Sequence, residues 1–353
     1  MASMKRVSPL FERSSARRRG RAKSRPRVGA LALLLGLWVG PALADPLVIE
    51  ARPVALDTKN PDQRRMGDLV YLGGLVLTST DKRFGGLSGL AIAADGQRML
   101  AVGDHGHWVG ARLIHDRTGA LIGIGEAEIT PLGDERGNPV AGRHGDAEEI
   151  ASLAGGGYAV SFERHHRIAI YPGDPFMPGN NRGALLTSPP ELSAAPDNKG
   201  IEALTEIEPG RLLAVTEGSF LGAERLRGWV ISSTEPPTES AILSYASRDA
   251  LRPTAFAKIP GGDVLVLERA YSIAAGLRVR LMRLDATAIA PGAALQASEI
   301  ARFSGAQTTD NFEGLAVHRD DRGRILIYMI SDDNFSWLQR TLLLQFELLK
   351  APS

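Results

Sequence analysis

The chain has 353 residues, of which 44% are hydrophobic and 23% are charged, and it contains no cysteine. The lack of cysteine excludes disulfide bonds, thiolate metal sites and a cysteine nucleophile. The formal net charge of +1 hides an asymmetry, because residues 1–44 hold ten of the 41 basic residues and one of the 40 acidic ones, and the rest carries a net charge of −8. An acidic remainder disfavours attraction to nucleic acid or anionic lipid, so we expect no nucleic-acid partner.

Residues 1–44 have the features of a signal peptide. Residues 1–27 are basic, Val28–Ala44 is apolar, and Ala42-Leu43-Ala44 forms an A-x-A cleavage site. The apolar run is shorter than the roughly 20 residues that usually span a membrane. An uncleaved anchor is the alternative. We therefore expect a periplasmic or secreted protein without a stable membrane anchor after cleavage, and one domain over residues 45–353.

The first runs of the mature chain are typical of strands. Leu47–Leu56 and Leu69–Thr78 are apolar, and Arg340–Leu349 is a similar run near the C-terminus. We expect one of the N-terminal runs to pair with the C-terminal run, because joining the two ends of a ring of sheets removes exposed sheet edges.

A strand-turn-strand unit recurs along the rest of the chain. Its first copy, 85–108, has apolar strands at Leu90–Ala93 and Met99–Val102, joined by a glycine turn and followed by an acidic loop. Counted from their opening residues Ser88, Glu148, Glu202, Thr254 and Glu313, the copies are 52 to 60 residues apart.

Repeats of about 40 to 50 residues with several short strands are typical of β-propeller blades. We predict an all-β fold, a β-propeller closed by pairing of N- and C-terminal strands. At about 51 residues per blade, the 309 residues after the signal peptide predict six blades.

Acidic residues recur at two positions of the unit. The opening position holds Glu148, Glu202 and Glu313, and a position 14 to 19 residues later holds Asp104, Glu163, Glu217, Glu268 and Asp332. Because one repeat position forms a ring around a propeller's channel, we expect these carboxylates to gather there and to need a neutralising partner.

Two partners are open. One is a hard divalent cation, Ca²⁺ rather than Mg²⁺, with oxygen ligands from Glu148, Glu202, Glu217, Glu313 and Asp332. The other is a ring of ion pairs with basic side chains such as Arg164, Arg167, Arg269 and Lys199 at the blade junctions.

Histidines are the second chemical signal. Five of the seven lie in the first two repeats, including His105 and His165. We name His105, His165 and Glu163 as candidate catalytic residues, since imidazole and carboxylate groups serve as general bases. The alternative is that these histidines are structural. No G-x-S-x-G, H-E-x-x-H or G-x-x-x-x-G-K-[ST] pattern is present, which disfavours ordinary serine hydrolases, zincins and P-loop enzymes.

Several short segments together resemble one family. GGLSGLA at 85–91, DAEEIA at 146–151, NKGIEAL at 198–204, LERAYS at 267–272 and DNFEGLAV at 310–317 are similar to the phytase-like, "esterase-like activity of phytase", family of exported bacterial proteins. The resemblance implies a propeller-like fold and hydrolysis of an ester or phosphoester.

The resemblance leads to two functional readings. The first is an exported hydrolase of a small-molecule ester, phosphoester or lactone, with a divalent cation at the acidic channel mouth. The second is a non-catalytic scaffold that binds a ligand or a protein partner. Calcium-dependent propeller phytases neutralise a polyanion with basic side chains, whereas the repeated positions here are acidic, so phytase activity itself is not expected.

Overall fold

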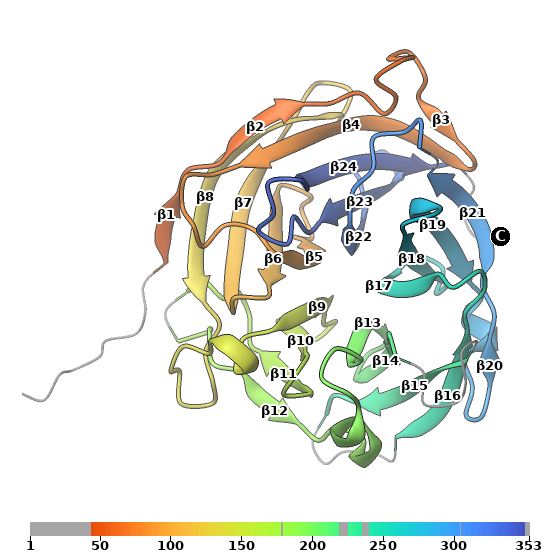
Figure 1. The fold of residues 1–353 in the computed structure, drawn as a ribbon. Helices are drawn as coiled ribbons and strands as arrows, with labels where there is room; N and C mark the ends of the chain where they lie inside the picture. Colours follow the sequence, from red (N-terminus) through yellow and green to blue (C-terminus); the bar gives the residue numbers. More distant parts are fainter. Residues whose placement is uncertain (1–43, 178, 219–224, 235–239, 304, 350–353) are drawn as a thin grey trace, which may run out of the picture. The chain divides into compact units, whose positions relative to one another are not determined.

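Five largely antiparallel sheets surround a central axis in the computed structural model, which describes residues 44–177, 179–218, 225–234, 240–303 and 305–349 (Figure 1). All the strands belong to one compact unit, residues 40–353. The fold is therefore all-β and a propeller, as predicted. The predicted signal peptide, residues 1–44, lies outside the described residues apart from Ala44.

Each sheet is one blade, and its strands run outward from the axis in chain order, except that N-terminal strands form the outer edges of the first and the final blades. The innermost strands are β5 (Leu87–Ile92), β9 (Ala147–Ser152), β13 (Ile201–Glu208), β17 (Arg252–Lys258) and β22 (Phe312–Arg319). The second strands are β6 (Arg98–Gly103), β10 (Tyr158–Phe162), β14 (Arg211–Thr216), β18 (Val264–Ser272) and β23 (Ile325–Ser331). These ten strands are the five repeats seen in the sequence.

The outer strands complete the blades. The third strands are β7 (His107–His115), β11 (Arg167–Tyr171), β15 (Arg225–Ser232), β19 (Gly276–Leu284) and β24 (Thr341–Leu348). The fourth are β8 (Leu121–Pro131), β12 (Ala184–Leu186), β16 (Ala241–Ala246), β21 (Ser298–Phe303) and β4 (Leu69–Thr78). Short edge strands add β1 (Asp45–Leu47), β2 (Glu50–Pro53), β3 (Arg65–Met66) and β20 (Ala294–Leu295). The 3₁₀ turns are η1 (Gly142–His144), η2 (Pro190–Ala194) and η3 (Ala286–Ala288).

The predicted number of six blades is wrong. The structure has five, so that residues 45–353 provide about 62 residues per blade. The extra length lies in the short edge strands and in long connections such as the one between β12 and β13, which the repeat spacing could not assign to a blade.

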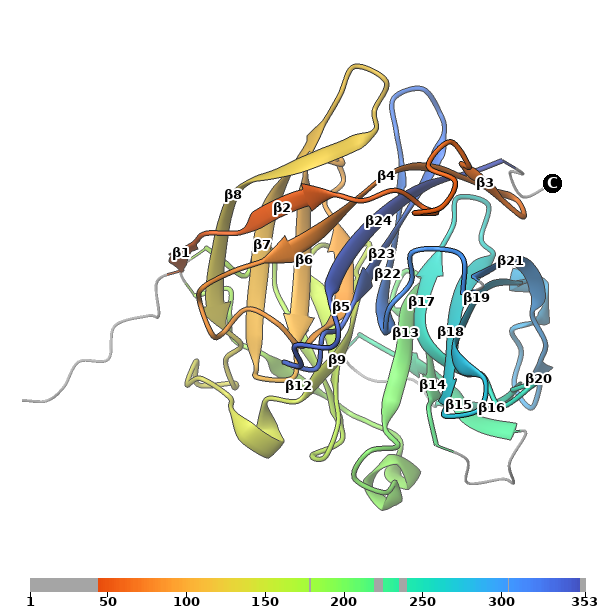
Figure 2. The same cartoon turned by 45° about the horizontal axis from the view of Figure 1, so that its top comes forward.

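The last blade combines both ends of the described chain. β4 pairs antiparallel with β24, from Thr341 opposite Leu77 to Leu348 opposite Leu69. Its neighbour in the ring is the first blade, and Figure 2 shows β4 and β24 running together above the inner strands. Apolar side chains of the two blades, including Leu90, Leu343 and Tyr328, form one buried cluster.

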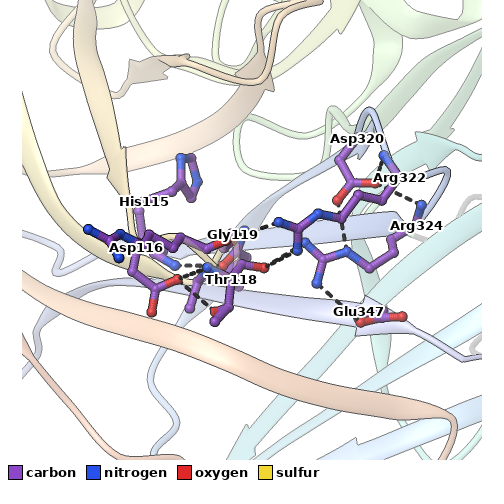
Figure 3. Close-up of polar contacts among 12 residues, drawn as sticks. His115, Asp116, Thr118, Gly119, Asp320, Arg322, Arg324 and Glu347 are labelled. Carbon is purple, nitrogen blue, oxygen red and sulfur yellow. Dashed lines mark hydrogen bonds and ion pairs between the residues drawn. The ribbon is translucent and has the colours of Figure 1, made fainter.

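A polar clasp also joins these two blades (Figure 3). It lies between the β7–β8 hairpin and the β22–β23 turn. Arg322 and Arg324 donate to the carbonyl oxygen of Thr118 at 3.1 and 3.0 Å. Arg324 also bonds Asp320 at 2.8 Å, and His115 lies 3.1 Å from the Tyr328 hydroxyl. The arginines of the clasp donate their hydrogen bonds to backbone carbonyls and neighbouring carboxylates. We therefore interpret the clasp as a structural contact between the two blades.

No helix among the described residues is long and apolar enough to cross a membrane.

Candidate metal and active site at the channel mouth

The inner strand of every blade carries the same irregularity near its start. One residue is skipped in its pairing with the second strand, which makes a β-bulge in all five blades. The skipped residues are Ser88, Glu148, Glu202, Thr254 and Glu313. A bulge redirects a side chain without ending the sheet, and bulges are common beside active sites. The predicted opening position of the repeat is thus one structural position at one end of the channel, which we call the channel mouth.

The second acidic position lies directly beside the first. In four blades the residue after the second strand donates its amide to the carbonyl two residues before the bulge, as Glu163 does to Asp146 at 2.8 Å and Asp332 to Asn311 at 2.9 Å. In the fourth blade this place belongs to Arg269, which pairs with Arg252.

Glu268, which the sequence placed in this ring, is therefore one residue away from it. Its buried carboxylate accepts from Arg280 and from the Tyr245 hydroxyl at 2.7 Å. At this position the fourth blade thus has the positively charged Arg269, where the other blades have carboxylates. The prediction that Glu268 belongs to the ring is therefore wrong.

Two groups of three carboxylates form at the mouth. Asp104, Asp146 and Glu148 make one, and Glu148, Glu163 and Glu202 make the other; within each group the oxygens lie within 4.8 Å of one another. Glu148 belongs to both groups. Oxygen donors at this spacing fit a hard divalent cation, whereas they repel one another without one.

Burial sets the electrostatics of these groups. It raises the pKa of Asp104 to about 7, although the Ser88 hydroxyl donates to this carboxylate at 2.9 Å and opposes the shift. Burial likewise raises the pKa of Glu163 to about 7 and that of Asp332 to about 8. The pKa values of Glu148 and Glu202 are also raised well above the usual range of a glutamate, first by burial and then by neighbouring carboxylates. Near neutral pH the site therefore holds protons unless a cation replaces them.

Glu163 and Glu202 are hydrogen-bonded to each other. Glu163 Oε1 also accepts the amide of Gly200. Burial raises the pKa of both carboxyl groups, so that the pair holds a proton near neutral pH in the absence of a cation.

The remaining predicted ligands lie at the edge of these groups. Glu313 forms an ion pair with Arg269, from Nη2 to Oε1 at 2.6 Å, and accepts from Asn311 at 2.7 Å. Asp332 accepts from the amide of Asn334 at 2.6 Å. Glu217 is close enough to Glu163 and Glu202 to raise their pKa values. The ion-pair alternative from the sequence thus occurs at Glu313 with Arg269 and at Asp146, whose carboxylate pairs with Arg164 Nε at 2.7 Å, while the cation alternative stays a prediction.

Asp104 and Asp146 were not predicted as ligands. Asp104 stood at the second acidic position, but it was not chosen. Asp146 comes two residues before a bulge, and only the strand register reveals that this place faces the mouth.

The histidines are divided between two places. His105 is exposed and stacks on Phe335, with the ring centroids 4.0 Å apart. It is close enough to Asp146 to oppose the rise in the pKa of this carboxyl group that burial causes, so it lies beside the mouth. His165 is also exposed, but it packs near His144 with centroids 4.5 Å apart. Burial and then the positive charge of His144 and Arg167 lower its pKa. The structure thus brings Glu163 and His105 to the mouth and places His165 in another cavity, with His144 and Arg167.

One further acid fills the channel below the mouth. Glu149 is buried, and its Oε1 accepts a hydrogen bond from the backbone amide of Ile150 at 2.9 Å. Hydrogen bonding from the backbone amides of Leu90 and Phe256 also opposes the rise in the pKa of this carboxyl group that burial causes. Glycine at the equivalent place of the first blade is required, because a Cβ at Gly89 would lie 2.7 Å from the Ile150 nitrogen. Glu149 therefore ties three inner strands together.

A propeller with a carboxylate-lined channel mouth defines the structural class. Within that class, the family model described as "Phytase-like: Esterase-like activity of phytase" matches residues 82–335. The chain belongs to this family. The match contains all five bulges and both groups of carboxylates.

Several solved structures align with the chain at low sequence identity. An α-L-arabinofuranosidase from Podospora anserina, solved with cellotriose, is 11% identical with a TM-score of 0.46 over 81% of this chain and 98% of that one. A gluconolactonase candidate is 11% identical with a TM-score of 0.42 over 86% and 92%. An inactive virginiamycin B lyase from Staphylococcus aureus is 10% identical with a TM-score of 0.40 over 84% and 99%. No curated protein sequence matches the chain significantly.

Proposed function

We propose that the protein is an exported hydrolase of a small-molecule ester or phosphoester, with a divalent cation, Ca²⁺ rather than Mg²⁺, at the channel mouth. The observation that carries the proposal is the pair of carboxylate groups joined through Glu148. The family description, which names esterase-like activity, supports it. On this proposal the pairing of β4 with β24 closes the ring and keeps the carboxylates in place.

The two groups suit two different tasks. Asp104, Asp146 and Glu148 would hold the cation, because hard oxygen donors are what Ca²⁺ prefers. When bound, the cation supplies Lewis-acid polarisation of the carbonyl or phosphoryl oxygen. Glu163 and Glu202 would form the acid–base pair, since their carboxyl groups are in contact and burial raises the pKa of both, which lets the pair hold a proton near neutral pH.

Hydrolysis follows from this division. Glu163 takes a proton from water while the water oxygen bonds to the acyl carbon or the phosphorus of the substrate. The bond from that atom to the alcohol oxygen breaks, and the proton on Glu202 passes to the leaving oxygen. The proton on Glu163 then returns to Glu202 across their hydrogen bond, so the products are an acid and an alcohol. His105, exposed beside Asp146, is placed to exchange protons with solvent.

A substrate screen with cation control tests the proposal. The mature protein is assayed on p-nitrophenyl acetate, p-nitrophenyl phosphate and δ-valerolactone in Ca²⁺ and in EDTA. We expect at least one substrate to be hydrolysed, EDTA to remove more than about 99% of the rate because the Lewis acid is lost, and Ca²⁺ to restore it. Glu148→Gln should lose the rate, while Glu126→Gln, an exposed control, should keep it. Turnover that EDTA leaves unchanged contradicts the cation mechanism, and cation binding without any turnover favours the scaffold.

A further inference from the structure

A pocket of about 610 Å³ opens directly beside the channel mouth. Its inner end includes Glu313 and Asn311 of the acidic site, together with Arg269. Its outer walls come from the hairpin after β18 and from the loop between β23 and β24, through Tyr271 and Leu338. We call this cavity the side pocket.

Exposed apolar side chains gather on these same two segments. Tyr271 and Leu338 are each 71% exposed, and their neighbours Ile273 and Trp337 are 97% and 90% exposed. These side chains are among the most exposed large apolar residues of the described chain. Grouped apolar exposure of this kind marks surfaces that bind a ligand or a partner, whereas a single exposed residue needs no explanation.

The inner end of the side pocket is polar and has one positive charge. Arg269 uses Nη2 to bond Glu313 at 2.6 Å, and its buried Nε has no hydrogen-bond partner among the described residues. A buried donor without a partner is costly, and such groups are often satisfied by a ligand. The polar end therefore suits one carbonyl, carboxylate or phosphoryl oxygen.

The balance of charge in the lining limits what can bind. Arg269 is the one basic residue in it, and Asp310 and Glu313 are carboxylates. Asp310 already bonds Arg340 at 3.1 Å, and Glu313 bonds Arg269. A ligand with many negative charges would meet these carboxylates without enough cations, so the lining disfavours polyanions.

We propose that the side pocket binds the apolar part of the substrate, so that the substrate is a neutral or singly charged ester with an alkyl, acyl or aryl group rather than a polyanion. This inference rests on the proposed hydrolase function. The ester group lies at the acidic site, where the cation would polarise its carbonyl oxygen. Its other oxygen faces Arg269, and the apolar group lies between Tyr271 and Leu338.

Chain-length series test the pocket by activity. p-Nitrophenyl acetate, butyrate and hexanoate are compared on the wild type, on Tyr271→Ala with Leu338→Ala, and on Ile273→Ala. Each buried methylene should raise kcat/KM about fourfold. The double variant should lose most of this increase, whereas Ile273→Ala should keep the wild-type dependence on chain length. Ile273→Ala is the matched control, because Ile273 is on the same hairpin and outside the pocket lining.

A binding series tests the pocket without turnover. Methyl-, butyl- and hexylphosphonate are titrated in Ca²⁺, and the fluorescence of Trp337 reports binding, since Trp108 and Trp229 are buried. The dissociation constant should fall with chain length in the wild type and not in the double variant.

The two series separate the two ideas. If no ester is hydrolysed but phosphonate binding tightens with chain length and depends on Tyr271 and Leu338, the hydrolase proposal fails and the pocket stands. If the wild type shows no dependence on chain length in either series, or if the double variant keeps the wild-type slope, the pocket inference is overturned.

Discussion

Arg269 and Glu313 form an ion pair at the channel mouth, with 2.6 Å between Nη2 and Oε1, and only 22% and 8% of their side chains are exposed. Arg269 occupies the place at which the other four blades carry a carboxylate. The chain therefore supplies a buried positive charge to the ring of acids, in addition to the more exposed Arg164, which pairs with Asp146 at 2.7 Å. The charges of Glu202 and Glu217 also raise the pKa of the Arg269 guanidinium.

Replacing this cation should destabilise the protein strongly when no metal is present. Arg269→Met leaves Glu313 buried without its partner, and the loss of one member of a buried pair costs about 3 to 5 kcal/mol. Arg269→Met with Glu313→Gln should recover much of this loss, and Ca²⁺ should reduce it further. Urea unfolding of the four proteins of the cycle, with and without Ca²⁺, measures the effect. Equal stability of the wild type and Arg269→Met in EDTA would contradict the role given to Arg269.

The metal-free protein should lose stability as the pH rises. Burial raises the pKa of Asp104 and Glu163 to about 7 and that of Asp332 to about 8, above their values in the unfolded chain. The folded state thus binds more protons than the unfolded state between about pH 4 and pH 8, and stability falls across this window.

Melting in EDTA from pH 4.5 to pH 8.5 checks this slope. We expect Tm to fall by on the order of 5 °C, since 1 kcal/mol corresponds to about 2 °C for a domain of this size. Ca²⁺ should flatten the profile, because a cation replaces the protons. A Tm that rises over the same range in EDTA is the opposite sign and would refute the assignment.

The rate of hydrolysis should follow the titration of Glu163. The proposed base must be deprotonated to accept a proton from water, so kcat/KM in Ca²⁺ should rise with pH through a value below about 7, because the nearby cation lowers the pKa of Glu163 from its metal-free value of about 7. Glu163→Gln should reduce kcat/KM by about 10² to 10⁴. His165→Asn should change it little, because His165 lies away from the carboxylates. A larger loss in His165→Asn than in Glu163→Gln would reverse the assignment.

The repeat positions could be predicted from the sequence because each blade has the same residue position at the bulge of its inner strand. Ser88, Glu148, Glu202, Thr254 and Glu313 open the repeats, and each is the bulged residue of its blade. The strands were equally predictable, since apolar runs and glycine turns mark them. The blade count was not, because edge strands and long connections carry no repeat signal.

The details of the site depend on strand register, which cannot be read from the sequence alone. A shift of one residue makes Arg269, and not Glu268, the equivalent of Asp104 and Asp332. Asp146 joins the first carboxylate group because its place beside the bulge faces the mouth. The place of His165 could not be predicted from the sequence either, since the β10–β11 turn holds it near His144.

Export is a separate prediction from the sequence. Cleavage after Ala44 should leave Asp45 as the first residue, which in the structure begins β1 and pairs with Ile129. N-terminal sequencing of protein secreted from an expressing cell measures it. A mature N-terminus upstream of Val28 would show that the leader is retained.

The proposed mechanism requires that the carboxylates joined by Glu148 bind a divalent cation. The most direct measurement is thermal unfolding of the EDTA-treated protein with added Ca²⁺ or Mg²⁺, on the wild type, Glu148→Gln and the exposed control Glu126→Gln. At a free Ca²⁺ concentration of about 100 times the dissociation constant, binding stabilises the native state by about 2.7 kcal/mol. We predict that Ca²⁺ raises the Tm of the wild type and of Glu126→Gln, and does so more than Mg²⁺, while Glu148→Gln loses most of the increase. If neither ion moves the wild-type transition, or if Glu148→Gln responds as the wild type does, the carboxylates are not a cation site and the proposed mechanism is wrong.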